Sequence, residues 1–351
     1  MESPFIRFLL ADDTACCWDF RMARKRWIVP WSGTGKPAIY HCVSRVVDRR
    51  FAFGPDEKEM FRQLMRRVER YSGCRVLAYC AMSNHIHILL EVTPAAEGGV
   101  DDAELLCRVA ALYGKGGAEI FGQELEAARQ AVESGTGTRR QVEETRARHL
   151  RRMHDLSEFM KTLLQRFTQW FNRRESRTGN LWEDKFRSVI VEDAAAARVV
   201  AAYIDLNPVR AGIVPDPGAY RWSSYGEATG RAGRREVEPA RAGLARVMSL
   251  GGARGGGDPS WDREISQAYR SLLLRGRLKD PLQPADLDKT LRGRVRHFTA
   301  GGAIGSKEFI ETVFRACPER FGPKRTTGAR RMRGRASPLR DVVWSARDLG
   351  G

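Results

Sequence analysis

The sequence predicts an α+β fold of the ferredoxin-like class, in which helices cover one face of a four-stranded antiparallel sheet. Two observations lead to this class. The periodic segments follow the order strand, helix, strand, strand, helix, strand, and a two-residue turn is expected between the middle strands. The first strand is expected from Ile39 to Val47. The first helix is expected from Asp56 to Tyr71, where apolar residues recur at helical spacing.

The remaining elements complete this order. Two strands are expected at residues 75–82 and 85–92, joined by Ser83 and Asn84. An amphipathic helix is expected at 156–171 and a fourth strand at 187–192. An alanine-rich segment then predicts a last helix. Pro208 ends this helix near Asn207, because proline disfavours helical backbone in the residue before it.

Other parts of the chain are expected to surround this fold. Residues 1–21 precede a second methionine and are predicted to be an N-terminal extension. The main domain is expected at 22–228, interrupted by a helical insertion at 96–150. Glycine-rich residues 229–258 predict a flexible linker, and residues 259–351 predict a basic, mostly helical or flexible C-terminal region. Within that region a short helix is expected from Lys307, with Ser306 as its N-cap.

The charge of the chain is its strongest compositional feature. The formal net charge is +17 at pH 7, which favours polyanionic partners because each neutralised phosphate releases counterions. No apolar run approaches the ~20 residues of a membrane span, and no long basic amphipathic helix is present, so nucleic acid is favoured over a membrane. Seven cysteines without a Cys-x-x-Cys pair argue against a disulfide framework and predict a reducing cytoplasm.

Two of the six histidines, His85 and His87, flank one apolar residue on the predicted third strand. Side chains alternate faces along a strand, so both imidazoles project from the same side and could bind one metal ion. The alternative is a pair of half-buried histidines with a packing role, because neutral imidazole is tolerated inside proteins.

A second pair, Tyr203 and Asn207, lies on the last predicted helix. The two are four residues apart and are therefore neighbours on one helical face. If this helix lies across the third strand, the Asn207 oxygen joins both imidazoles at one ion, and Tyr203 faces it. These ligands suit Mn²⁺ better than Mg²⁺, although Mg²⁺ is the more available ion, and they do not decide between the two. Alternatively, Tyr203 fills the core and Asn207 caps the helix end.

Such an arrangement predicts phosphoryl chemistry. A phenol with its ordinary pKa near about 10 is a poor nucleophile at neutral pH. A divalent cation helps by polarising a scissile phosphate and aligning it for attack. The product is a covalent phosphotyrosine, which conserves bond energy so that a strand can later be rejoined.

Together, several motifs resemble the single-tyrosine transposases of the HUH (His-hydrophobic-His) superfamily, and most nearly the REP-associated tyrosine transposases. The motifs are Tyr40–Arg45, Asn84–Ile88, Gly179–Trp182 with Lys185–Phe186, Tyr203 with Asn207–Gly212, and Tyr220–Ser224. The resemblance covers residues 37–226 apart from the insertion. It identifies 22–228 as a transposase catalytic domain.

This resemblance implies an enzyme that cuts single-stranded DNA next to a hairpin, forms a 5′-phosphotyrosine and releases a 3′-hydroxyl. Tyr203 matches the nucleophile, and His85 and His87 match the metal-binding pair, for Mg²⁺ or Mn²⁺. Asn207 stands where a third polar ligand is expected. The residues expected to contact DNA are His41, Arg45, Lys185, Arg187 and Arg210. The protein is expected in the bacterial cytoplasm, associated with the nucleoid, as a monomer or homodimer.

A different function on the same fold is a domesticated, non-catalytic regulator that binds single-stranded nucleic acid. Sheets of this type stack bases on aromatic side chains, and the chain offers Tyr40, Phe51, Phe53, Trp182 and Tyr225. The intact set of His85, His87, Tyr203 and Asn207 distinguishes the enzyme, because a pure binder has no use for it.

Overall fold

The computed structural model describes residues 28–29, 35–192, 195–230, 233–251, 259–274, 297–321, 325–331 and 344–347. The predicted extension at 1–21 lies outside the described residues, as do parts of the predicted linker and of the basic C-terminal region. No helix in the described ranges is both long and apolar enough to cross a membrane.

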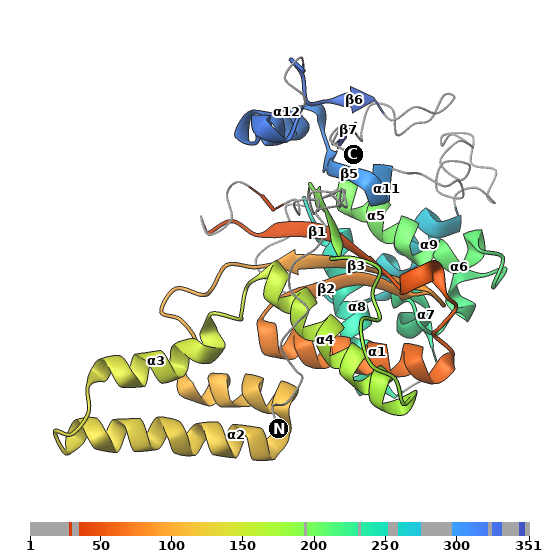
Figure 1. The fold of residues 1–351 in the computed structure, drawn as a ribbon. Coiled ribbons are helices and arrows are strands. Elements are labelled where there is room, and N and C mark those ends of the chain that lie inside the picture. The colour runs from red at the N-terminus through yellow and green to blue at the C-terminus, as the bar shows by residue number, and fades with distance from the viewer. Residues whose placement is uncertain are drawn as a thin grey trace, which may run out of the picture.

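The four predicted strands form one half of the sheet (Figure 1). They are β1 (Ala38–Arg45), β2 (Arg75–Ala81), β3 (His85–Val92) and β4 (Arg187–Val191). Their order is β2-β3-β1-β4, and every neighbouring pair is antiparallel. This is the order of a ferredoxin-like sheet, and the predicted α+β class is confirmed.

The sheet is wider than predicted, because the C-terminal region adds strands beyond β4. These are β5 (Gly301–Gly305), β7 (Trp344–Arg347) and β6 (Arg330–Arg331), which bring the described sheet to seven strands. β5 runs parallel to β4, and the outer pairs are antiparallel. The prediction of only four strands was therefore wrong. Three glycines in five residues gave β5 no strand signal, because glycine is depleted in strands.

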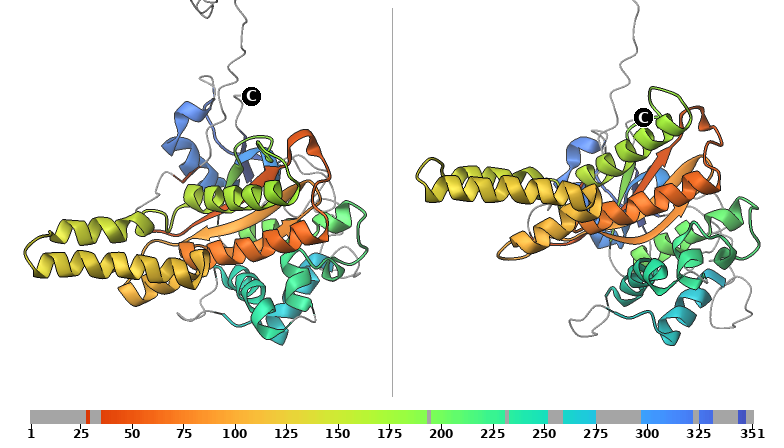
Figure 2. Two further views of the ribbon diagram at one scale, coloured as in Figure 1. Left: turned by 60° about the horizontal axis from the view of Figure 1, so that its bottom comes forward. Right: turned by 90° about the horizontal axis from the view of Figure 1, so that it is seen from below.

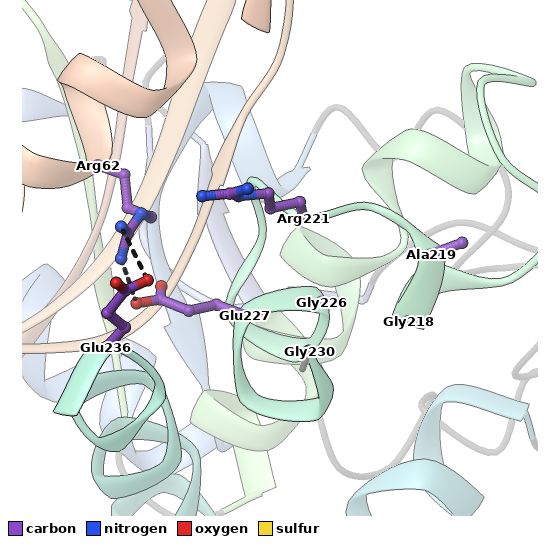
Figure 3. Close-up of a pocket in the computed structure, with 8 residues that line it drawn as sticks. All are labelled: Arg62, Gly218, Ala219, Arg221, Gly226, Glu227, Gly230 and Glu236. Carbon is purple, nitrogen blue, oxygen red and sulfur yellow. Dashed lines mark hydrogen bonds and ion pairs between the residues drawn. The ribbon is translucent and has the colours of Figure 1, made fainter. Parts of the chain in front are cut away.

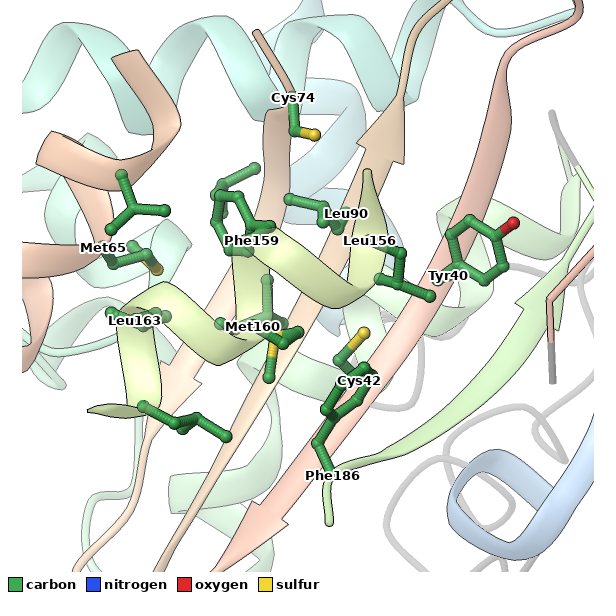
Figure 4. Packing of buried hydrophobic residues seen from close by; sticks show 14 of the residues in the cluster. Tyr40, Cys42, Met65, Cys74, Leu90, Leu156, Phe159, Met160, Leu163 and Phe186 are labelled. Atoms are coloured by element: carbon green, nitrogen blue, oxygen red, sulfur yellow. The ribbon is translucent and has the colours of Figure 1, made fainter. Parts of the chain in front are cut away.

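One face of the sheet is covered by α1 (Pro55–Ser72) and α4 (Leu156–Arg174). Both helices begin with a cap: the Glu57 side chain accepts from the Gly54 N–H, and the Asp155 side chain accepts from the Glu158 N–H. Their apolar stripes pack on the sheet in one core (Figure 4). Residues from both layers of this core include Tyr40, Cys42, Met65, Leu90, Phe159 and Leu163.

The other face is covered as well, by α5 (Ala195–Asp205), α8 (Arg234–Ser249) and α9 (Arg263–Leu274). The expectation that helices cover only one face of the sheet was therefore wrong (Figure 2). α8 also replaces part of the predicted 229–258 linker. Its Gly243 reflects close packing rather than flexibility, since a Cβ there would lie 2.3 Å from the carbonyl oxygen of Val76 in β2.

The predicted insertion at 96–150 is helical, as expected. α2 (Asp102–Glu133) and α3 (Arg139–Leu150) run side by side away from the sheet as an arm (Figures 1 and 2). α2 changes direction at Gly114, whose φ of 80° lies in the left-handed region that favours glycine.

Short elements complete the described chain. They are α6 (Asn207–Arg210), α7 (Ser224–Thr229), α11 (His297–Ala300), α12 (Lys307–Ala316), and the 3₁₀ turns η1 (Val47–Arg49), η2 (Pro217–Ala219) and η3 (Pro318–Arg320). The predicted start of α12 is confirmed, because the Ser306 hydroxyl accepts from the Phe309 N–H.

Candidate active site

The strands direct the histidines of the site to the face under α5. On β1, β3 and β4 the odd-numbered apolar residues Ile39, Leu89 and Val189 belong to the core that contains α5. Because side chains alternate along a strand, His85 and His87 share that face. Their ring centroids are 5.0 Å apart. The predicted projection of both imidazoles from one side is confirmed.

Tyr203 of α5 lies against these histidines although it comes far later in the sequence. Its ring centroid is 6.1 Å from that of His87 and 6.1 Å from that of His41, and both contacts are edge-on. The helix therefore brings the predicted nucleophile to the predicted metal-binding pair.

His41 belongs to the same cluster. The expectation that it contacts DNA at the surface was therefore wrong. His41 is 0% exposed, because it lies in the middle of β1 beneath α5 and α11. Its Nε2 is 3.0 Å from Nδ1 of His87, and its Nδ1 is 2.7 Å from the carbonyl oxygen of Phe298. Burial lowers the pKa of His41 to about 4. Burial, together with the neighbouring His85, lowers the pKa of His87 well below its ordinary value.

His85 is oriented by its neighbour. Its Nδ1 is 2.7 Å from Oδ1 of Asn84, while Nδ2 of Asn84 donates to the carbonyl of Arg49 at 3.0 Å. The second bond fixes which end of the amide faces the ring. An amide oxygen only accepts, so Nδ1 of His85 carries the hydrogen and Nε2 carries the lone pair.

Asn207 does not present a ligand oxygen in this conformation. Its Nδ2 donates to the carbonyls of Tyr203 and Ile204 at 3.2 and 3.1 Å, and its Oδ1 accepts from Nη2 of Arg210 at 2.5 Å. The carbonyl contacts are those of a helix cap, which the sequence left open as the alternative. An oxygen paired with a guanidinium is a poor place for a second cation.

Arg210 also differs from its expected role in binding DNA. Its guanidinium carbon lies 3.8 Å from the ring centre of Tyr203, and Nη1 donates to the Tyr203 carbonyl at 2.9 Å. Burial lowers the pKa of Arg210. The side chain therefore covers the ring of Tyr203, because the turn after Pro208 directs it back onto α5.

Three basic residues of the DNA-binding prediction do reach the surface. Lys185 and Arg187 are exposed, and Arg45 is half-buried. In the sheet Arg45 lies opposite His85, and Arg187 lies opposite Val43, whose other neighbour is His87. These basic side chains therefore lie at the end of the sheet where His85 begins β3, which we call the end of the histidine row (His41, His87 and His85).

Access to the phenol is narrow. Tyr203 is 5% exposed. The ring of Phe298, from α11, packs on it with centroids 4.5 Å apart. The phenol of Tyr203 becomes accessible only when the covering side chains move.

The donor set fits a small metal site of two imidazoles. Among the residues that the structure describes, no group of three or more histidine, cysteine or acidic side chains could hold a metal ion. A two-histidine site leaves the remaining positions to water and to a substrate phosphate, as in metal sites that act on phosphates.

Two surface pockets lie away from the cluster around Tyr203. One is lined by Arg62, Arg221, Glu227 and Glu236 with neighbouring glycines (Figure 3). The carboxylate of Glu227 is buried there. It accepts from Arg62 and Arg66, at 3.1 Å each, and from the Tyr79 hydroxyl at 2.6 Å. These contacts join α7 to α1 and β2.

The second pocket lies between α4 and the loop before β4. Trp182 and Lys185 of the Gly179–Phe186 motif line it. Neither pocket includes a residue of the cluster around Tyr203.

Residues 36–97 match a family model described as transposase, IS200-like. The matched segment spans β1 to β3 and contains His41, His85 and His87. This segment is similar to the IS200-like transposases. The predicted resemblance to the tyrosine transposases is thereby confirmed. The transposase match ends before Tyr203, which joins the site only in three dimensions.

Among solved structures, a REP-associated tyrosine transposase bound to a REP hairpin matches with a TM-score of 0.35 and 14% identity. The match covers 59% of this chain and 84% of that transposase chain. No curated protein matches the chain.

The sequence did not predict that His41 belongs to the cluster, or that Phe298 contacts both His41 and Tyr203. Strand alternation could have found the first, since His41 and Arg45 both have odd positions on β1, beside the histidine strand. Nothing in the sequence signals Phe298, whose carbonyl meets a ring 257 positions away.

Proposed function

We propose that this transposase cleaves and rejoins single-stranded DNA next to hairpins through a 5′-phosphotyrosine on Tyr203. The observation that carries the proposal is the position of the Tyr203 ring, 6.1 Å from that of His87 on the face it shares with His85. The choice of hairpin-flanked DNA comes from the resemblance of the motifs.

In the proposed reaction the phenolic oxygen of Tyr203 attacks the phosphorus of the scissile phosphodiester. The bond between phosphorus and the 3′ oxygen breaks, and that oxygen takes a proton and leaves as a 3′-hydroxyl. The phenol gives up its own proton to solvent. Rejoining reverses these steps, with a 3′-hydroxyl attacking the phosphotyrosine and the phenol regaining a proton.

His85 and His87 hold Mg²⁺ or Mn²⁺ in this proposal. The ion, when bound, supplies polarisation of the phosphate. Arg210 holds the ring of Tyr203 by a cation–π contact, an interaction worth about 0.5–2 kcal/mol. Arg45, Lys185 and Arg187 bind the DNA backbone at the end of the histidine row.

The test is a denaturation-resistant adduct. Purified protein and a labelled, hairpin-bearing single-stranded oligonucleotide are mixed with Mn²⁺ or Mg²⁺ and resolved on a denaturing gel. Wild type forms a slow-migrating adduct, Tyr203→Phe forms none but still binds the oligonucleotide, and His87→Ala loses metal-dependent cleavage. Tyr113→Phe, on the arm, is the matched control and keeps the adduct. An adduct that survives Tyr203→Phe refutes the assignment of the nucleophile.

Two observations favour the second candidate, a non-catalytic binder of single-stranded nucleic acid. Tyr203 is 5% exposed and Asn207 caps α5, as expected for purely structural residues. For a binder, the same oligonucleotide binds wild type and Tyr203→Phe equally, and neither gives an adduct with either metal.

A further inference from the structure

We infer that His41 is a positioning residue that sets the tautomer of His87 and so directs the Nε2 lone pair of His87 towards the metal. This role deepens the proposed function and rests on it for the identity of the ligand. The role depends on a chain of hydrogen bonds between three groups: the carbonyl of Phe298, the ring of His41 and the ring of His87.

The hydrogens along this chain follow from what each group is able to do. A carbonyl oxygen only accepts, so at 2.7 Å from the Phe298 oxygen Nδ1 of His41 carries the hydrogen. A neutral imidazole has one N–H, which leaves Nε2 of His41 as an acceptor. Nδ1 of His87, 3.0 Å away, must then be the donor. The remaining nitrogen of His87, Nε2, keeps its lone pair.

The surroundings keep this arrangement in place. His41 and His87 are 0% and 2% exposed, so water does not compete for either ring. The rings are stacked with centroids 5.1 Å apart and an interplanar angle of 23°. Both are held on paired central strands, β1 and β3, while the carbonyl comes from α11.

Asn84 does for His85 what His41 does for His87. In each case an acceptor takes the Nδ1 hydrogen, and Nε2 is the nitrogen with the lone pair. The two histidines of the predicted pair are thus prepared in the same tautomer. Partners of this kind fix ring orientation and raise ligand basicity in metal sites.

His41 is not itself a metal ligand in this arrangement. Its Nδ1 hydrogen points at the Phe298 carbonyl, and its Nε2 lone pair accepts from His87. Neither nitrogen has a lone pair left for an ion. This separates a positioning role from a third-ligand role, and the two predict different effects of glutamine at position 41.

The first test measures the tautomers directly. Histidine-selective ¹⁵N labelling and two-bond correlation spectra of the metal-free wild type at neutral pH report which nitrogen of each ring carries hydrogen. We expect hydrogen on Nδ1 of both His41 and His87. Hydrogen on Nε2 of His87 overturns the inference, whatever the enzymatic activity of the protein.

The second test measures Mn²⁺ affinity from the electron paramagnetic resonance signal of the free ion. His41→Leu removes the acceptor, and the Mn²⁺ dissociation constant is expected to rise about 10- to 100-fold. His41→Gln keeps an acceptor oxygen, and its dissociation constant stays within about threefold of wild type. His149→Leu is the control, a half-buried histidine on the arm whose Nδ1 is 3.1 Å from the Tyr71 hydroxyl.

The outcomes separate the two proposals. Unchanged Mn²⁺ affinity in a folded His41→Leu overturns the positioning role. Equal losses in His41→Leu and His41→Gln overturn it in favour of direct ligation. The inferred tautomers in a wild type that binds no Mn²⁺ support the hydrogen-bonded chain and refute the metal site of the proposed function.

Discussion

Asp205, on the same helix as Tyr203, is expected to make the protein less stable as the pH rises from about 4 to 7. The carboxyl is fully buried, and it accepts from the Tyr269 hydroxyl at 2.6 Å and the Tyr225 N–H at 3.0 Å. Burial outweighs these hydrogen bonds and raises the pKa of Asp205 from 3.8 to about 7. The folded state therefore holds this proton more tightly than the unfolded state.

The sign and size of the effect follow from that difference. The stability contributed by the protonated carboxyl is fully present below the unfolded pKa of 3.8 and is lost as the pH rises through the folded pKa of about 7. Each pKa unit corresponds to about 1.36 kcal/mol, so the whole change is about 4 kcal/mol. The helix that carries Tyr203 is thus held less firmly at alkaline pH.

The assay is urea unfolding of wild type and Asp205→Asn at a series of pH values from 4 to 8. Asn has no titrating proton, so the free energy of unfolding of the variant should gain about 4 kcal/mol on that of wild type across the series. The titration of His41, whose pKa burial lowers to about 4, affects both proteins and cancels in the difference. Asp184→Asn, at an exposed carboxylate, is the control for the substitution itself. A flat difference for Asp205→Asn would refute the reasoning.

Three further predictions concern packing, charge and DNA. Gly243→Ala should lower the free energy of unfolding, measured in urea, by about 1–3 kcal/mol, because the new Cβ would lie 2.3 Å from the Val76 carbonyl oxygen. Gly116→Ala on the arm is the control: its Cβ would meet nothing within 4 Å, so this variant should not be destabilised. Glu227→Ala should cost about 3–5 kcal/mol in the same measurement, because the buried Arg66 loses a partner at 3.1 Å; a loss below 1 kcal/mol would contradict this. Arg187→Gln should reduce the salt dependence of single-stranded DNA binding by about 0.7 in the log–log slope, measured by fluorescence anisotropy, and an unchanged slope would place Arg187 outside the DNA path.

Much of the fold could be read from local patterns. The four central strands, the helix after the first of them, the amphipathic helix at 156–171 and the helical arm all appear where periodicity placed them. Each of these segments shows its period within a few turns or strand residues, which is why one sequence suffices. The sequence predicted the meeting of Tyr203 with His87 only on the condition that the last helix lies across the third strand, and the structure meets that condition.

Other features depended on contacts between distant segments. The glycines at 251–257 predict a linker over residues 229–258, yet α8 forms within this range and its one glycine, Gly243, lets the helix approach β2. β5 is a strand only because β4 offers it a free edge.

By itself, then, the sequence determined the order of strands and helices along the chain and the paired imidazoles on one face of a strand, because these follow from local period and alternation. The contact of Tyr203 with these imidazoles depends on how the last helix packs on the sheet. Only the tertiary structure decided that His41 is held between His87 and the Phe298 carbonyl, and that Arg210 lies on Tyr203 and takes the oxygen of Asn207. Hydrogen-bond partners are chosen by atoms a few ångströms apart in space. Residues far apart in the chain carry no pattern that records such proximity.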